Sequence, residues 1–263
     1  MQHHQSRSRQ LIALITILLI AGCGQNTRES PSRDVARATV REEDQLTGQV
    51  STEDLRRILS DKTALVLDTR PFMEYAKGHI PGALNVSRKQ GLPISEYTSD
   101  VAEIGRIVEG DKAASVVLYC NGPLCGKSKR VAEALVTEGY SDVRRYQLGM
   151  PVWRALGGVT QIEAEGLRYV YQHDPTATFV DARSPADIET GSIRGAQNIS
   201  LPDVKKAKDD LRLPMEDHNT RIVVFGSDAA QARAVAEEIA RNAFHNVGYF
   251  AGTCEALDSA IAP

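Results

Sequence analysis

The sequence predicts an α/β protein of two tandem units, each a central, mostly parallel β-sheet flanked by helices. Short apolar runs, such as 116–119 and 222–225, alternate with amphipathic helical patterns, as expected for a parallel sheet. In addition, the segment 68–87 matches the segment 181–200 without a gap, with identical residues at eight positions. The chain of 263 residues is long enough for two such units.

The first 22 residues are predicted to be a lipoprotein signal peptide. Arg7 and Arg9 precede an apolar run over 11–20, and small residues lead to Cys23. This is the order of a secretory signal, and the run is too short to span a bilayer. The end of the segment resembles the lipobox of bacterial lipoproteins, which implies that Cys23 is lipid-modified and anchors the chain to the membrane. An ordinary secretory peptide with an incidental cysteine is the alternative.

The lipobox resemblance implies a cell-envelope protein that faces the periplasm. Because Gly24, rather than an acidic residue, follows Cys23, outer-membrane sorting is expected if the host is Gram-negative. Residues 23–47 are polar and are interpreted as a tether, in which the acidic run 42–44 is expected to be a solvated charge cluster. The formal net charge of −3, without a sustained basic block, argues against nucleic-acid binding.

The first unit is expected to span 48–159. A start resembling a capping box at Ser51 predicts its first helix, and the apolar run 64–67 predicts a strand after it. A second apolar run ends at Cys120, and the pattern over 127–138 predicts a helix directly after the loop that carries this cysteine. Ligands of parallel sheets gather at the carboxyl ends of the strands, which is where Cys120 is expected.

The second unit is expected to span 160–263. Its strand over 222–225 leads to Gly226, which holds the position of the cysteine, in a loop about two residues shorter. Ser227 or Asp228 is expected to cap the helix that follows. Because no thiol remains in this loop, we expect the second unit to be catalytically inactive.

Several motifs together resemble the rhodanese family. The Asp-x-Arg at 68–70, the run 74–85, the strand into Cys120, and 148–150 followed by Trp153 occur in the order of that family. The resemblance implies two tandem rhodanese-like domains that use no cofactor and no metal. It further implies a cysteine that takes a sulfane sulfur from thiosulfate or a related small donor and passes it, as a persulfide, to a thiol or other thiophilic acceptor. Trp153 suits core packing better than substrate stacking.

The candidate catalytic residue is Cys120, because a helix N-terminus favours the thiolate that acts as nucleophile. The candidate substrate-binding loop consists of Asn121, Gly122, Pro123, Leu124, Cys125, Gly126 and Lys127. Its backbone amides can form a nest for an anion, and Gly122 and Gly126 allow positive φ. Lys127, ahead of Lys129, is expected to supply a cation. The loop lacks the Cys-x5-Arg pattern of related phosphatases, which disfavours phosphatase activity, and its unusual Asn121 and Cys125 leave the donor open.

The cysteines set a further expectation. With Cys23 acylated, three thiols remain in an oxidising compartment and cannot all pair with one another, and Cys120 is the one expected to be free. Cys125 is interpreted as a small apolar side chain at the base of the loop. The alternative is that it resolves an oxidised Cys120 as a disulfide. Cys254 is expected to be a buried free thiol.

Asp68 and Arg70 suggest a catalytic pair beside Cys120. However, Asp181 and Arg183 persist in the unit without a nucleophile, which favours a structural ion pair. His79 is interpreted as a turn-stabilising residue rather than a base, because of the motif around it.

Two other functions stay open from the sequence. One is a non-catalytic binding module for an unknown protein partner in the cell envelope. The other is a thiol-redox protein that uses Cys120 and Cys125.

Overall fold

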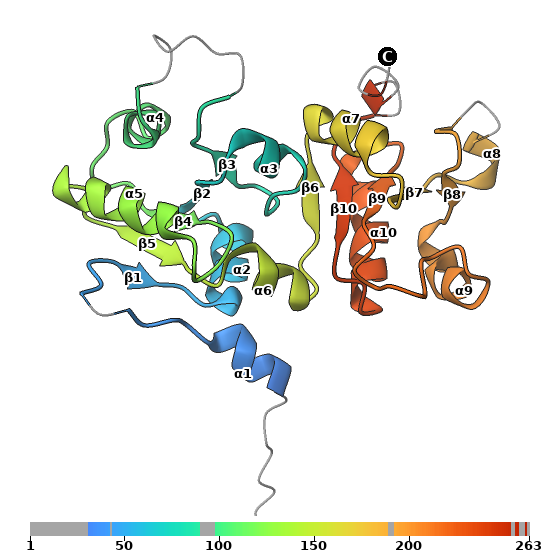
Figure 1. Ribbon diagram of the computed structural model, residues 1–263, viewed down its shortest axis with the longest axis horizontal. Helices are drawn as coiled ribbons and strands as arrows, with labels where there is room; N and C mark the ends of the chain where they lie inside the picture. The colour runs from blue at the N-terminus through green and yellow to red at the C-terminus, as the bar shows by residue number, and fades with distance from the viewer. Residues whose placement is uncertain are drawn as a thin grey trace, which may run out of the picture.

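The computed structural model describes residues 31–42, 44–89, 98–188, 192–253, 256–257 and 261. The predictions of a signal peptide over 1–22, of lipidation at Cys23 and of a free thiol at Cys254 concern residues outside these ranges. Two five-stranded sheets lie next to each other, and the chain completes one before it enters the other (Figure 1). The α/β prediction is confirmed, because every strand pair in both sheets is parallel.

The first sheet has the order β1-β5-β4-β2-β3, so that β4 is its central strand. Its strands are β1 (Gly48–Gln49), β2 (Leu65–Asp68), β3 (Leu84–Asn85), β4 (Val116–Tyr119) and β5 (Val143–Tyr146). All four residues of β4 are buried, which explains why it appears in the sequence as a continuous apolar run.

Helices cover both faces of the first sheet. They are α2 (Thr52–Asp61), α3 (Phe72–Ala76), α4 (Asp100–Ile107), α5 (Gly126–Thr137) and α6 (Gly149–Ala155). Val117 and Tyr119 of β4 pack with side chains of α2 and α6, whereas Val116 and Leu118 pack with α4 and α5. This alternation follows from the two-residue period of a strand. The capping box expected at Ser51 is present, with Asp54 as its partner.

The second sheet repeats this topology in the order β6-β10-β9-β7-β8. Its strands are β6 (Thr160–Ile162), β7 (Thr178–Asp181), β8 (Gln197–Asn198), β9 (Ile222–Phe225) and β10 (Val247–Phe250). Its helices are α7 (Ala164–His173), α8 (Pro185–Ile188), the 3-10 helix η2 (Leu201–Asp203), α9 (Val204–Asp209) and α10 (Ala229–Arg241). The central strand is β9, the counterpart of β4.

The two units meet through backbone contacts around His79. The amide of His79 donates to the carbonyl of Gln161 (3.0 Å), and the amide of Gln161 donates back (2.9 Å). Near this bridge, α7 packs on the end of α3, where a Cβ on Gly166 would stand 2.0 Å from the carbonyl oxygen of Ala76. Gly166 is therefore required for this close approach. Trp153 is buried and donates to the carbonyl of Val159, so the prediction of core packing is confirmed.

The tether is more ordered than the sequence suggests. It contains α1 (Pro31–Arg37), and Arg37 pairs with Glu53 of α2 at 2.8 Å. The expectation of a solvated charge cluster is wrong for Glu42, which pairs with the buried Arg145 at 3.0 Å and with Lys129 at 3.5 Å. The guanidinium of Arg145 is buried in β5 and needs a counter-charge, which its neighbours in the sequence do not supply.

Candidate functional site

Cys120 follows directly after Tyr119, the last residue of the central strand β4. It therefore lies at the carboxyl edge of the sheet, as the sequence predicts. In the strand register, Tyr119 stands between Asp68 of β2 and Tyr146 of β5. Cys120 is only 3% exposed, so any reagent must reach it through the loop that follows.

A disulfide joins Cys120 to Cys125. Two expectations are thus wrong: Cys120 is not the free thiol, and Cys125 is more than an apolar filler. The Cα atoms are 6.2 Å apart, within the range that a disulfide requires. A turn brings them together, because the amide of Cys125 donates to the carbonyl of Gly122 at 3.0 Å. Since that amide is already bonded, it is not available to an anion nest.

The loop is held against the start of α6. Gly122 has φ +113°, as the sequence predicts, whereas Gly126 begins α5 and is not among the residues with positive φ. Gly149 has φ +61°, and a Cβ on it would stand 2.4 Å from the carbonyl oxygen of Cys120. Met150 donates its amide to that same carbonyl. The small residue at 149 therefore allows the loop to pack tightly.

The outer part of the loop faces solvent. Leu124 is fully exposed, Pro123 is exposed, and Cys125 is partly exposed. The side-chain amide of Asn121 donates to the carboxylate of Glu74. Glu74 thus places a negative charge beside the residue that follows Cys120.

The lysines expected to serve the site are already engaged. The ammonium group of Lys127 lies 3.0 Å from the carboxylate of Asp100 and donates to Ser87 at 2.6 Å, and Lys129 pairs with Glu42. Their charges are therefore compensated.

Arg130 is the cation that the sequence argument missed. One of its guanidinium nitrogens lies 3.1 Å from the point where a Cβ on Gly126 would stand. Within the part of the chain that the structure describes, no carboxylate is paired with Arg130. The sequence contained a sign of this contact, because residues four apart lie on one face of a helix and Gly126 and Arg130 are four apart on α5.

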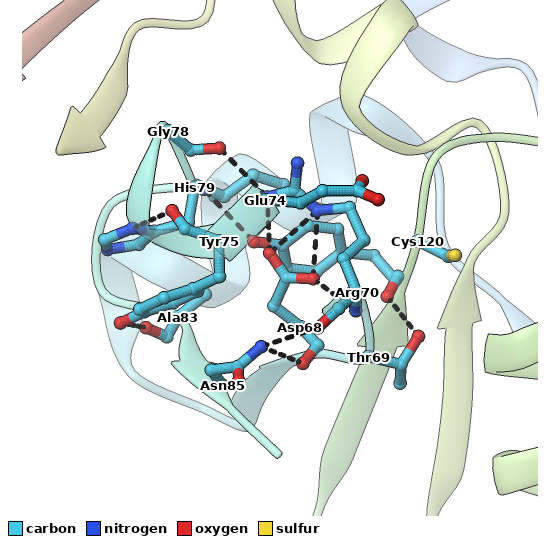
Figure 2. Close-up of polar contacts among 12 residues, drawn as sticks. Asp68, Thr69, Arg70, Glu74, Tyr75, Gly78, His79, Ala83, Asn85 and Cys120 are labelled. Atoms are coloured by element: carbon cyan, nitrogen blue, oxygen red, sulfur yellow. Dashed lines mark hydrogen bonds and ion pairs between the residues drawn. The ribbon is translucent and has the colours of Figure 1, made fainter. Parts of the chain in front are cut away.

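Asp68 and Arg70 form the expected ion pair, with 2.6 Å between Nη2 and Oδ2. Arg70 also donates to the carbonyl of Gly78 (Figure 2). Asn85 ties the same turn by donating to the carbonyls of Asp68 and Arg70. Figure 2 shows the sulfur of Cys120 directed away from this network. The contacts of Asp68, Arg70 and Asn85 connect the end of β2 to the turn that follows it.

His79 is buried in the turn before β3. Its ring stacks on Tyr75 with centroids 3.8 Å apart, and Nδ1 is 3.1 Å from the carbonyl oxygen of Tyr75, which assigns the Nδ1 proton to that bond. Burial lowers the pKa of His79 to about 4, against the opposing effect of that hydrogen bond. Its Nε2 lies 3.6 Å from the carboxylate of Glu163 in the second unit, whose own pKa is raised by burial. These contacts fit a residue that holds a turn and the unit boundary.

The second unit closes its equivalent loop differently. Asp228 is the N-cap of α10, and its carboxylate accepts from the amide of Gln231 at 2.9 Å, as one of the two predicted caps. The side chain of Gln231 accepts from the amide of Ser227, and a Cβ on Gly226 would stand 2.6 Å from that side chain. The space that Cys120 uses in the first unit is thus filled here by the capping residues.

A cavity of about 980 Å³ lies elsewhere, between the two units. It is lined among others by Leu65, Trp153, Arg233 and Tyr249, but not by residues 120–127. Leu65 begins β2, so the cavity is near the edge of the sheet opposite Cys120. In the described part of the chain there is no group of three or more His, Cys, Asp or Glu side chains suited to a metal ion. Nor is any helix in that part long and apolar enough to cross a membrane.

Comparison with known proteins identifies related sequences. The family model of the Rhodanese-like domain matches residues 51–156 and 169–260. An HTH-type transcriptional regulator of Mycobacterium tuberculosis is 36% identical over 105 residues, which are 40% of this chain and 40% of the regulator. A thiosulfate:glutathione sulfurtransferase of Saccharomyces cerevisiae is 29% identical over 116 residues, which are 41% of this chain and 78% of the yeast protein.

Among solved structures, the crystal structure of a thiosulfate sulfurtransferase from Pseudomonas aeruginosa is 21% identical, with a TM-score of 0.35. It covers 78% of this chain and 41% of the other. The family membership of this chain therefore rests on the match to the family model and not on this structure.

Proposed function

The chain belongs to the rhodanese-like domain family, and from that premise we propose that it is a sulfurtransferase whose nucleophile is Cys120. The supporting observation is the place of Cys120, at the carboxyl end of the central strand and directly before a loop that leads into α5. The second unit has Gly226 at that place and a capped helix. The proposal therefore assigns the chemistry to the first unit.

The reaction proceeds in two steps once the disulfide is reduced. The Cys120 thiolate attacks the sulfane sulfur of thiosulfate or a related donor, forms a sulfur–sulfur bond, and expels sulfite or the corresponding anion. A thiol or cyanide-like acceptor then takes the outer sulfur and releases the thiolate, which gives ping-pong kinetics. The N-terminal turn of α5, whose N-cap Cys125 offers no side-chain hydrogen bond, and the guanidinium of Arg130 favour the anionic forms of Cys120.

The test is loading of the reduced Cys125→Ser chain, which cannot close the Cys120–Cys125 disulfide, with thiosulfate or inorganic polysulfide, followed by intact mass spectrometry. We expect a gain of one sulfur atom that disappears when Cys120→Ser is added and persists when Cys254→Ser is added instead, the matched control. No gain with either donor, or a gain that survives the addition of Cys120→Ser, would contradict the proposal.

A thiol-redox function is the second candidate, because the structure contains the Cys120–Cys125 disulfide. In that case the pair exchanges with an external dithiol and no sulfane sulfur is carried. Turnover of a disulfide substrate by a chain that never gains sulfur would favour this candidate.

We also propose that Cys23 is lipidated and holds the protein on the periplasmic side of the envelope, at the outer membrane of a Gram-negative host. The basis is the order of Arg7 and Arg9, the apolar run and the small residues before Cys23. Metabolic labelling with a fatty-acid analogue should mark the full chain and leave Cys23→Ser unlabelled. Equal labelling of both would contradict the anchor.

A further inference from the structure

We infer that Cys125 is a second catalytic residue, which discharges the persulfide on Cys120 and releases hydrosulfide. The inference rests on the proposed function, because it needs the Cys120 persulfide as its substrate. It adds an activity to that function: with no external acceptor, the protein itself reduces the bound sulfane sulfur. The observation that carries it is the disulfide between the two cysteines.

The step is balanced within the loop. The Cys125 thiolate attacks Sγ of Cys120, the Sγ–Sγ bond forms, and the bond from Sγ of Cys120 to the outer sulfur breaks. The outer sulfur leaves as HS⁻ with the electron pair. In this step the outer sulfur, protonated in the persulfide, gains one electron and the sulfur of Cys125 loses one; counted from the two reduced cysteines and a zero-valent sulfane sulfur, two electrons pass from the cysteines to the released sulfide. The product is the disulfide that the structure contains.

The conformation of the loop brings the two cysteine sulfurs together. The turn from Gly122 to Cys125 and the positive φ of Gly122 set the Cα atoms of the cysteines 6.2 Å apart. The close packing of Gly149 and the hydrogen bond from Met150 hold the carbonyl of Cys120 from the other side, so Cys120 has little freedom to move away from Cys125. A fixed, short approach favours an intramolecular attack over one by a dilute external thiol.

Exposure determines how the pair is reset. Cys120 is 3% exposed, whereas Cys125 is partly exposed, so an external dithiol must attack the sulfur of Cys125. The leaving group is then the Cys120 thiolate, at the uncapped start of α5, where a negative charge is favoured. The second thiol of the reductant frees Cys125, and the chain is ready for another donor. The full cycle thus consumes one sulfane donor and one dithiol.

The test is a single turnover of the reduced full chain without any thiol acceptor. Thiosulfate labelled at the sulfane sulfur, or inorganic tetrasulfide where thiosulfate does not load the chain, serves as the donor. Labelled sulfide is trapped with a bimane reagent, and the chain is analysed by intact mass. We expect the wild type to release about one sulfide per chain and to end two hydrogens lighter than its reduced form.

The variants separate the inference from the proposed function. Cys125→Ser should keep the added sulfur and release at least about tenfold less sulfide, whereas Cys254→Ser should behave as the wild type. A wild type that keeps a stable persulfide as Cys125→Ser does would overturn the role of Cys125 and leave Cys120 as the sulfur carrier. A Cys125→Ser chain that gains no sulfur from either donor, although folded by circular dichroism, would overturn the proposed function itself.

Discussion

The two units differ most at the end of their central strands. After β4 the chain makes a loop closed by the Cys120–Cys125 disulfide and enters α5 without a side-chain cap. After β9 it passes through Gly226 and enters α10 under the cap of Asp228. Beneath these loops the units are alike: Asp68–Arg70 and Asp181–Arg183 have nearly the same distances, 2.6 and 2.7 Å between Nη2 and Oδ2.

The comparison separates scaffold from chemistry. Asn85 and Asn198 each bond two carbonyls of the turn, again with matching distances. Because this network is also present in the second unit, where Gly226 holds the position of the cysteine, it does not depend on a thiol. Among the described residues, the disulfide-bonded cysteine pair is found in the first unit alone.

The largest expected effect concerns the shared ion pair. Asp68→Asn removes the carboxylate that pairs with Arg70, which is 4% exposed, and Asp181→Asn removes the corresponding carboxylate beside Arg183. Breaking a buried pair in this way costs about 3–5 kcal/mol. We expect both variants to lose stability in urea unfolding, and reduced Asp68→Asn to release sulfite from thiosulfate at wild-type stoichiometry below its unfolding transition. Loss of this release in the folded variant would mean that the network takes part in catalysis.

The next prediction concerns the pH dependence of stability, to which His79 contributes in the first unit alone. Burial lowers the pKa of His79 from 6.5 to about 4, whereas its counterpart Ser192 does not titrate. Between these pH values the unfolded chain binds a proton that the folded chain does not. The stability from the neutral ring is therefore complete above pH 6.5 and is lost as the pH falls towards 4, by about 3 kcal/mol in all.

The measurement is urea unfolding from pH 7 to pH 4 for the wild type and His79→Gln, which keeps a donor for Tyr75. Because Glu163 is present in both chains, its raised pKa cancels in the difference. The pH dependence should be weaker in His79→Gln by about 2–3 kcal/mol. Equal slopes would show that His79 is already charged in the folded state.

The sequence was sufficient for the scaffold because its signals are local. Buried strands appear as apolar runs, the cap at Ser51 as a motif, and the duplication as a repeat of 68–87 in 181–200. The position of Cys120 followed from the end of β4. These features depend on neighbours in the chain, so a pattern is enough to predict them.

The site itself depends on contacts across space, and there the sequence was insufficient. Glu42 reaches Arg145 across more than a hundred residues, and Asp100 neutralises Lys127 from another helix. The disulfide depends on how far the loop folds back at Gly122, and Cys-x4-Cys spacing alone leaves that open. The guanidinium of Arg130 can lie beside the loop because Gly126 has no side chain there.

A smaller effect is expected from Arg130, and its size tests whether this residue contributes to the site around Cys120. Arg130→Ala removes the guanidinium beside Gly126 and should lower kcat/KM for thiosulfate about tenfold, which corresponds to about 1.4 kcal/mol. Arg233→Ala is the matched control, since Arg233 is an arginine of α10 already paired with Glu237. Steady-state assays at low and high salt should show that the loss shrinks as salt rises, because screening weakens the attraction in the wild type. A loss of equal size in Arg233→Ala would remove Arg130 from the site.

The smallest effect concerns the cap that only the second unit has. Asp228→Ala removes the carboxylate that accepts from Gln231 and should lower the free energy of unfolding by about 1 kcal/mol. The reverse change, Cys125→Asp, offers such a cap to α5, where none exists, and should recover stability relative to Cys125→Ala. Urea unfolding of reduced chains measures both, so that loss of the disulfide is common to the pair at position 125. If Cys125→Asp is no more stable than Cys125→Ala, the difference between the two helix starts lies in the path of the loop rather than in the capping side chain.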